Sequence, residues 1–162
     1  MPRTKVTHLA PVGLVLPRFV VEPIMYHFPD RVGIIDEDKQ FTYGEFFERS
    51  WRLANGLLSL GIEKYDHIAT LTPNVHEGLE AVYATLTLGC VSVPGNTRLS
   101  PEELCWQLND SETKVLIVDW EYTHLVAPIV NKLQTVKHII ITSGGKKKAD
   151  LKGIDYEEFL TT

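Results

Sequence analysis

Short apolar runs alternate with longer stretches whose apolar residues recur every three or four positions, and this alternation constrains the fold most. The runs occupy residues 68–71, 90–93, 115–118 and 138–142. Continuous apolar runs of this length are typical of strands covered on both faces, and such strands separated by amphipathic helices form parallel sheets. The sequence therefore predicts an α/β fold: alternating strands and helices, with a mostly parallel sheet and helices on both of its faces.

Capping residues mark the expected ends of the helices. Thr42 and Ser100 each stand three residues before a glutamate, which is the spacing of a capping box. Asn74 is expected to cap the helix between them. Gly61 and Gly89 stand where left-handed C-terminal caps are expected. A short hairpin is predicted over residues 32–41, before the first of these helices.

Apolar stripes at helical spacing predict which helix faces pack on the sheet. A fourth helix is expected over residues 121–133, with Pro128 kinking it or delaying its start. The aromatic residues, Trp106 included, are interpreted as core residues. The two predicted core stripes comprise Tyr43, Phe46, Phe47, Trp51, Ala54, Leu57 and Leu58 in the first helix, and Val75, Leu79, Val82, Tyr83 and Leu86 in the second.

Charge and cysteine content limit the classes of partner. The 16 Lys+Arg residues against 21 Asp+Glu residues leave a net charge of -5, which does not favour a nucleic-acid partner. Cys90 lies in an apolar run and is expected to be a buried free thiol, which fits a reducing compartment and a cytoplasmic location. The histidines and cysteines lack metal-ligand spacing, so no metal site is predicted. No apolar run approaches the roughly 20 residues needed for a transmembrane segment.

Five short segments occur in a fixed order over about eighty residues, and together they carry a family resemblance. In that order and spacing they resemble the N-terminal part of the AMP-forming acyl-CoA synthetases, enzymes of the adenylate-forming ligase superfamily, with medium- and long-chain fatty-acid ligases as the nearest type. The segments are Phe41-Thr42-Tyr43-Gly44-Glu45, Leu57-Leu58-Ser59-Leu60-Gly61-Ile62, Pro73-Asn74-Val75-His76-Glu77, Pro94-Gly95-Asn96-Thr97-Arg98-Leu99-Ser100-Pro101-Glu102-Glu103-Leu104 and Lys114-Val115-Leu116-Ile117-Val118-Asp119.

The resemblance implies an activity for the complete enzyme. Such a ligase activates a carboxylic acid, here expected to be a fatty acid, with ATP and Mg2+ to an acyl-adenylate, and then transfers the acyl group to coenzyme A. In the family the nucleotide-gripping loop and the catalytic lysine lie further along the chain. No catalytic residue is therefore assigned, and none of these cofactors is expected to bind well to the 162 residues alone.

The same resemblance implies a domain division. Residues 1–28 are expected to form an N-terminal lead segment, and residues 29–162 the first subdomain of the AMP-binding domain, truncated before the phosphate-binding loop. Residues 143–146 follow a predicted strand and imitate such a loop, but they lack the family's longer Thr-Thr-Gly pattern. Uncovered apolar surface and an open sheet edge are expected to favour self-association.

Arg98 is the one candidate cofactor-binding residue. It follows a predicted strand end, where ligands of open α/β sheets gather, and its planar guanidinium suits a phosphate. The family's Asn-x-Arg-Leu arginine approaches the phosphates of coenzyme A, so the resemblance implies that role for Arg98. The alternative is a structural pairing of Arg98 with a nearby carboxylate or with exposed carbonyls. Asn96 is expected to fix the turn through its own side chain.

Two hypotheses about the whole chain remain open. One is an enzyme fragment, inactive alone; the other is a non-catalytic, stand-alone interaction module derived from an adenylating enzyme. A helix is predicted to begin at Asp155, only a few residues before Thr162. A helix so short depends on tertiary packing, so it is interpreted either as the opening of a longer element or as an ordinary short C-terminal helix.

Overall fold

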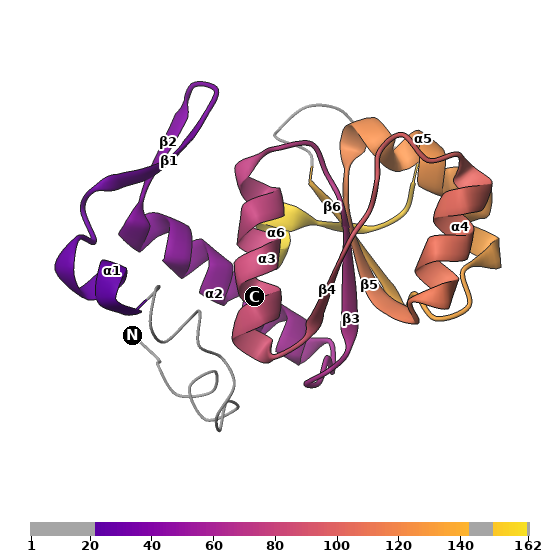
Figure 1. The fold of residues 1–162 in the computed structure, drawn as a ribbon, viewed down its shortest axis with the longest axis horizontal. Helices are drawn as coiled ribbons and strands as arrows, with labels where there is room; N and C mark the ends of the chain where they lie inside the picture. Colours follow the sequence, from indigo (N-terminus) through magenta and orange to yellow (C-terminus); the bar gives the residue numbers. More distant parts are fainter. Residues whose placement is uncertain (1–21, 143–150, 162) are drawn as a thin grey trace.

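A parallel five-stranded sheet organises the chain (Figure 1). The computed structural model describes residues 22–142 and 151–161. The strands stand in the order β4-β3-β5-β6-β7, and every neighbouring pair is parallel. The α/β class and four of the five strands, β3 to β6, are confirmed as predicted, whereas β7 was not predicted. Their bounds are β3 His67–Leu71, β4 Val91–Pro94, β5 Thr113–Asp119, β6 His138–Thr142 and β7 Ile154–Asp155.

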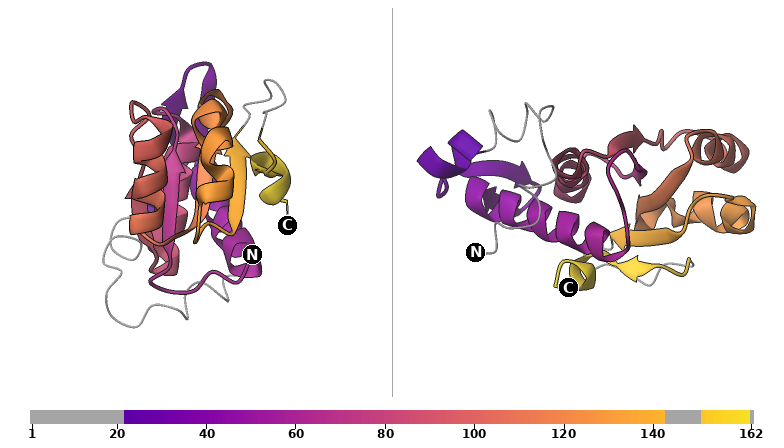
Figure 2. Two further views of the ribbon diagram at one scale, coloured as in Figure 1. Left: turned by 90° about the vertical axis from the view of Figure 1, so that its right-hand side faces the viewer. Right: turned by 90° about the horizontal axis from the view of Figure 1, so that it is seen from below.

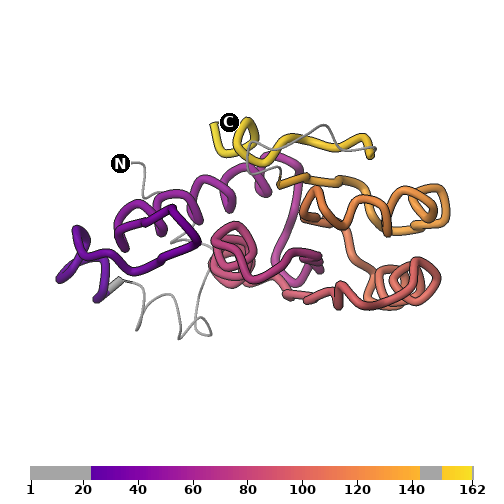
Figure 3. Tube along the Cα trace, turned by 90° about the horizontal axis from the view of Figure 1, so that it is seen from above, coloured from indigo at the N-terminus to yellow at the C-terminus, as the bar shows by residue number. Residues whose placement is uncertain are grey.

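Helices cover both faces of this sheet, as predicted (Figures 2 and 3). One face carries α2 (Tyr43–Ser59), α3 (His76–Leu88) and the short α6 (Tyr156–Phe159). The other carries α4 (Pro101–Asp110) and a broken helical segment that includes α5 (Thr123–Val126). Successive residues of β5 point to opposite faces, so Val115 and Ile117 join the first core cluster while Leu116 and Val118 join the second.

An aromatic cluster fixes the N-terminal hairpin on α2. The predicted hairpin is confirmed as β1 (Val32–Asp36) paired antiparallel with β2 (Lys39–Thr42), preceded by α1 (Glu22–His27). Phe46 and Phe47 form the buried centre of this cluster. Their partly buried neighbours are Ile24, Met25, Ile34, Phe41, Tyr43, Trp51 and Tyr83.

Local capping signals predicted most helix ends correctly. Thr42 and Ser100 both form complete capping boxes, and Gly61 and Gly89 adopt φ angles of 79° and 69°. The prediction that Asn74 caps α3 is wrong. Val75 occupies the N-cap without a side-chain bond.

The predicted core stripe of α3 is wrong except at Tyr83, which packs against Phe46 and Phe47. Leu79, expected in the core, is 38% exposed, whereas Ala81 and Ala84 are fully buried. Small residues let α3 approach α2 closely, so the close-packed face is not the face with the largest apolar residues. The buried residues of α3 are His76, Glu77, Glu80, Ala81, Ala84, Thr85, Thr87 and Leu88.

Two further expectations are corrected. The predicted helix over residues 121–133 is divided into η2 (Trp120–Tyr122), α5 and η3 (Ala127–Lys132), and a proline stands in the first turn of η3. Proline lacks an N–H and clashes with the preceding turn, which ends α5 early. Trp106 is 68% exposed because α4 turns Leu104 and Leu108 inward instead.

Cys90 is a buried free thiol, as predicted. The loop at residues 143–146 lies outside the described residues. Within residues 22–142 and 151–161, no helix has the length and apolar character needed to cross a membrane.

Candidate functional site

The carboxyl ends of the strands define the candidate site. Because β3, β4, β5 and β6 are parallel, the segments that follow them emerge at the same edge of the sheet. The segments after β3, β4 and β5 lead into α3, α4 and η2. Ligands of open α/β sheets bind in the crevices outside this edge.

Arg98 lies in the turn after β4. The backbone of this turn folds back on β3, where the Gly95 N–H donates to the Thr70 carbonyl at 2.7 Å. A Cβ atom at Gly95 would lie 3.0 Å from that carbonyl oxygen, a tight contact, so the close approach favours glycine. Asn96 Oδ1 accepts the Arg98 backbone N–H at 3.0 Å, which confirms the predicted role of Asn96 in the turn.

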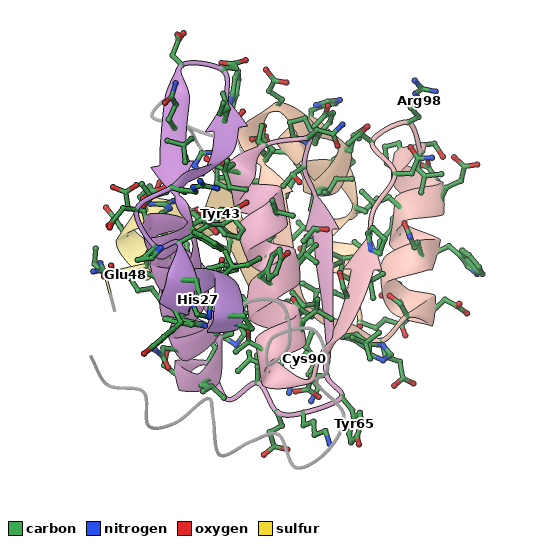
Figure 4. The ribbon with its side chains drawn as sticks, turned by 60° about the vertical axis from the view of Figure 1, so that its left-hand side comes forward. His27, Tyr43, Glu48, Tyr65, Cys90 and Arg98 are labelled. Carbon is green, nitrogen blue, oxygen red and sulfur yellow. The ribbon has the colours of Figure 1, made fainter. Side chains whose placement is uncertain are left out.

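The guanidinium of Arg98 points away from the sheet (Figure 4). The side chain is exposed and forms no ion pair or hydrogen bond with any other residue in the described part of the chain. Among the described residues, Arg98 thus pairs neither with a carboxylate nor with exposed carbonyls, the two forms of the structural alternative. An unpaired guanidinium at this edge suits a phosphate oxygen, and a role in binding coenzyme A remains a prediction.

Asp119 is the last residue of β5 and lies at the same edge of the sheet. One of its carboxylate oxygens accepts the Glu121 backbone N–H at 2.9 Å, and the other accepts the Thr142 hydroxyl at 2.8 Å. The first bond caps η2, and the second joins the ends of β5 and β6. This carboxylate is already used structurally, so we do not assign it to a magnesium ion.

A buried His–carboxylate cluster stands at the start of α3. Asp36, at the end of β1, accepts the His76 backbone N–H at 2.9 Å, and its Oδ2 lies 2.5 Å from His76 Nδ1. Glu77 Oε2 lies 3.0 Å from the same ring nitrogen, and the Phe41 ring stacks on the imidazole. Asp36 therefore provides the cap that was expected from Asn74. Asp36 and His76 are 40 positions apart, so no local sequence signal predicted their contact.

This cluster is not a natural site for the Mg2+ that the family resemblance implies. Asp36, His76 and Glu77 form the one grouping of three potential metal ligands in the part of the chain that the structure describes. Mg2+ prefers oxygen ligands in an octahedron and keeps several waters. A buried imidazole whose nitrogen already contacts both carboxylates offers neither condition.

Asp36 makes α3 sensitive to acid. Burial works against the ionised carboxylate, but hydrogen bonds from the His76 backbone and ring lower the pKa of Asp36 overall. A lowered folded-state pKa means that the stabilisation is complete above the unfolded pKa of about 3.9 and is lost as pH falls through the folded value. We therefore expect Asp36→Asn to destabilise the chain by about 1 kcal/mol at pH 7 and by much less at pH 3.

Urea unfolding at pH 7, 5 and 3 measures this difference. Asp38→Asn is the matched control, because Asp38 is exposed in the turn of the same hairpin. A constant difference between wild type and Asp36→Asn across the three pH values would contradict the assignment.

A second polar cluster, centred on the buried Glu80, joins α2, α3 and α6. Arg49 Nε donates to Glu80 Oε1 at 2.6 Å, and Arg49 Nη2 donates to Glu157 Oε1 at 2.6 Å. The Tyr156 hydroxyl donates to Glu80 Oε2 at 2.7 Å, and the side chain of Glu80 is 0% exposed. Arg49 and Glu157 are 108 positions apart, so no local signal in the sequence indicates their contact.

Burial and pairing compete in this second cluster. Burial raises the pKa of Glu80, and the hydrogen bonds and charge of Arg49 oppose that rise. Burial also disfavours the charged guanidinium, but its hydrogen bonds with Glu157 and Glu80 prevail and raise the pKa of Arg49. Burial, followed by the charge of Glu80, raises the pKa of Tyr156 well above its usual value. Arg49 is therefore a permanent cation that holds two carboxylates between three helices.

The family is established by comparison with known proteins. Residues 22–158 match the AMP-binding enzyme family, and the chain belongs to it. A long-chain-fatty-acid–CoA ligase of Thermus thermophilus is 40% identical over 119 residues, which are 74% of this chain and 21% of that protein. A peroxisomal butyrate–CoA ligase of Arabidopsis thaliana is 34% identical over 108 residues, which are 67% of this chain and 19% of that protein.

Solved structures agree with this assignment. An anthranilate CoA ligase in complex with anthranoyl-AMP shares the fold, with a TM-score of 0.82 at 21% identity over 98% of this chain and 29% of that chain. A Mycobacterium tuberculosis fatty acyl CoA synthetase has a TM-score of 0.69 at 30% identity, over 76% of this chain and 26% of that chain. The chain resembles the N-terminal region of adenylate-forming CoA ligases.

The chain spans about a fifth of the length of the curated relatives named above. The acids in their names also differ, since a related ligase of Bacillus cereus is named for 2-succinylbenzoate. Family membership thus defines the class of enzyme and does not define the acid.

Proposed function

We propose that this chain supplies the N-terminal part of an AMP-forming acid–thiol ligase whose substrate is a fatty acid. In the complete reaction a carboxylate oxygen attacks the α-phosphorus of ATP, and pyrophosphate leaves. The thiol sulfur of coenzyme A then attacks the acyl carbon, and AMP leaves with the C–O bonding pair. Bound Mg2+ would neutralise phosphate charge. The observation that supports the proposal most is the family match over residues 22–158, together with 40% identity to a long-chain ligase.

In that reaction, this chain would contribute to substrate binding and to the fold of the enzyme, and it would supply no catalytic residue. Arg98 would bind a phosphate of coenzyme A through its exposed guanidinium, which has no partner within residues 22–142 and 151–161. Residues 29–162 would form the first subdomain of a cytoplasmic enzyme, and the 162 residues alone would not catalyse adenylation. Catalysis of this kind depends on phosphate clamping and orientation, and the described residues provide no complete clamp.

A chimeric ligase tests the proposal. The 119 aligned residues of the Thermus ligase are replaced by the matching residues of this chain, and ATP–pyrophosphate exchange is measured with acids from butyrate to palmitate. We expect exchange by the chimera and none by the 162-residue chain. A chimera that melts cooperatively but shows no ATP–pyrophosphate exchange with any acid would contradict the ligase proposal and favour the interaction-module hypothesis.

Arg98→Ala in the chimera should raise KM for coenzyme A about tenfold, which is the loss expected for one charge-assisted hydrogen bond. ATP–pyrophosphate exchange without coenzyme A should stay unchanged, because Arg98 is proposed to contact only the thiol substrate. Arg52→Ala, which removes an exposed arginine paired with Glu48, is the control. Equal losses in exchange and in thioester formation would argue against the proposed role of Arg98.

A further inference from the structure

The carboxylate of Glu77 is buried at the start of α3 with few polar neighbours. Glu77 is 5% exposed. Its Oε2 lies 3.0 Å from His76 Nδ1, and its Oε1 lies 4.0 Å from Lys39 Nζ, which is beyond hydrogen-bond distance. Within residues 22–142 and 151–161, these two nitrogens are its only polar partners. Whether His76 can satisfy Glu77 therefore decides whether this carboxylate has a hydrogen bond at all.

His76 cannot satisfy both of the carboxylates that approach its ring. A ring nitrogen carries at most one hydrogen in either charge state of the imidazole, so Nδ1 donates to one acceptor at a time. Asp36 Oδ2 is the nearer acceptor at 2.5 Å, and it also accepts the His76 backbone N–H at 2.9 Å. Asp36 is thus satisfied, whereas Glu77 is left with the distant charge of Lys39. A buried carboxylate in this condition is costly unless a further partner binds it.

The three side chains together present the atoms of a metal site. Asp36 Oδ2, His76 Nδ1 and Glu77 Oε2 all lie within 4.8 Å of one another. A tetrahedral Zn2+ ion, with bonds of about 2.0–2.1 Å, holds its ligand atoms about 3.3 Å apart. The contacts of Nδ1 with the two carboxylates measure 2.5 and 3.0 Å, so the ligand atoms would separate by less than about 1 Å on binding.

The surroundings of this cluster also suit an ion. The Phe41 ring stacks on the imidazole of His76, with 4.6 Å between the ring centroids, and so fixes the plane of the ring. Outer contacts of this kind orient the histidines that bind metals. The side chain of Asp36 is 15% exposed, which gives an ion a path from solvent and leaves water for a fourth ligand position.

We propose that Asp36, His76 and Glu77 form a binding site for a divalent transition-metal ion, with Zn2+ as the expected ion. One imidazole nitrogen with two carboxylate oxygens is a ligand set that Zn2+ accepts, whereas Mg2+ and Ca2+ take oxygen ligands. The ion would tie the end of β1 to the first turn of α3 and so stabilise the folded chain. This site is separate from the Mg2+ of the proposed reaction and does not depend on ligase activity.

Titration with Co2+ measures binding directly. The 162-residue chain, without an affinity tag, is freed of metal with a chelator and titrated at pH 7. Tetrahedral Co2+ absorbs visible light much more strongly than hydrated Co2+, so the absorbance reports the geometry of the site as well as its occupancy. We expect one Co2+ per chain with a tetrahedral spectrum, and displacement of that Co2+ by Zn2+, which binds such ligands more tightly.

Two substitutions should change the affinity in opposite directions. Glu77→Gln keeps the volume of the side chain but removes one anionic ligand, so it should raise the Kd for Zn2+ at least about tenfold. Lys39→Met removes a cation that competes for Glu77, so it should lower the Kd about two- to fivefold. Glu48→Gln, on the exposed surface of α2, is the matched control and should leave the Kd unchanged. A gain of affinity cannot arise from misfolding, so Lys39→Met tests the site even if Glu77→Gln folds poorly.

Thermal unfolding provides an independent readout. Zn2+ at about 100 times its Kd should raise the Tm of the wild-type chain by about 5–10 °C, and it should raise the Tm of Glu77→Gln much less. Absence of a tetrahedral Co2+ spectrum in the wild-type chain would overturn the proposal. Binding that Glu77→Gln leaves unchanged would also overturn it and would assign the ion to exposed histidines such as His124. Weaker binding by Lys39→Met would contradict the assigned role of Glu77.

Discussion

Replacing Arg49 by methionine should lower the free energy of unfolding by about 3–5 kcal/mol, the typical cost of removing one partner from a buried ion pair. The guanidinium holds Glu80, whose side chain is 0% exposed, and also Glu157. Methionine fills much of the same volume but leaves the buried carboxylate of Glu80 with the Tyr156 hydroxyl alone. Most of the cost therefore comes from an uncompensated buried charge.

Urea unfolding of matched variants tests this expectation. Arg52→Met on the same helix removes an exposed pair with Glu48 and should cost no more than about 0.5 kcal/mol. Adding Glu80→Gln to Arg49→Met should restore part of the loss, because the charge is then gone. If Arg49→Met and Arg52→Met cost the same, the buried cluster does not hold the three helices together.

Leu57→Ala should cost about 2–5 kcal/mol, because it opens a cavity under α2 in the core shared with the sheet. Leu79→Ala makes the same chemical change on α3, yet it should cost less than about 1 kcal/mol, since Leu79 is already 38% exposed. Comparing these two variants separates the effect of the direction in which the leucine points, toward the core or the surface, from the effect of the residue type.

Thermal and urea unfolding of the two variants provide the measurement. The apolar periodicity of the sequence treats Leu57 and Leu79 alike, so it predicts equal losses. A large loss for Leu79→Ala in the isolated chain would contradict the orientation of α3 in which Leu79 is partly exposed.

Local signals explain what the sequence could predict. The strands of the sheet are continuous apolar runs, and Thr42, Ser100, Gly61 and Gly89 act within a few residues of themselves. Such features need no knowledge of the rest of the chain. The α/β class and the parallel sheet follow from them directly.

The predictions that were wrong share a different cause, because they depend on contacts between elements that are distant in sequence. Asn74 was expected to cap α3, but the cap comes from Asp36 in another element. The orientation of α3 depends on how closely its alanines approach α2, and periodicity alone cannot choose between an apolar side and a small-residue side. The Arg49 and His76 clusters join residues that are distant in sequence, so these clusters can be identified only from the tertiary structure.

The candidate site was predicted in part. The turn geometry at Asn96 and the position of Arg98 beyond β4 followed from the motif and from the strand pattern. The absence of a carboxylate partner for Arg98 among the described residues did not, because it depends on which acidic residues the fold brings near.

ATP–pyrophosphate exchange by the Thermus chimera is the most direct measurement of the central claim that this chain forms part of an adenylating ligase. We predict exchange that requires both an added fatty acid and the ligase portion outside the exchanged region. Exchange by the 162-residue chain alone, or a cooperatively folded chimera that exchanges with no acid, would contradict that claim.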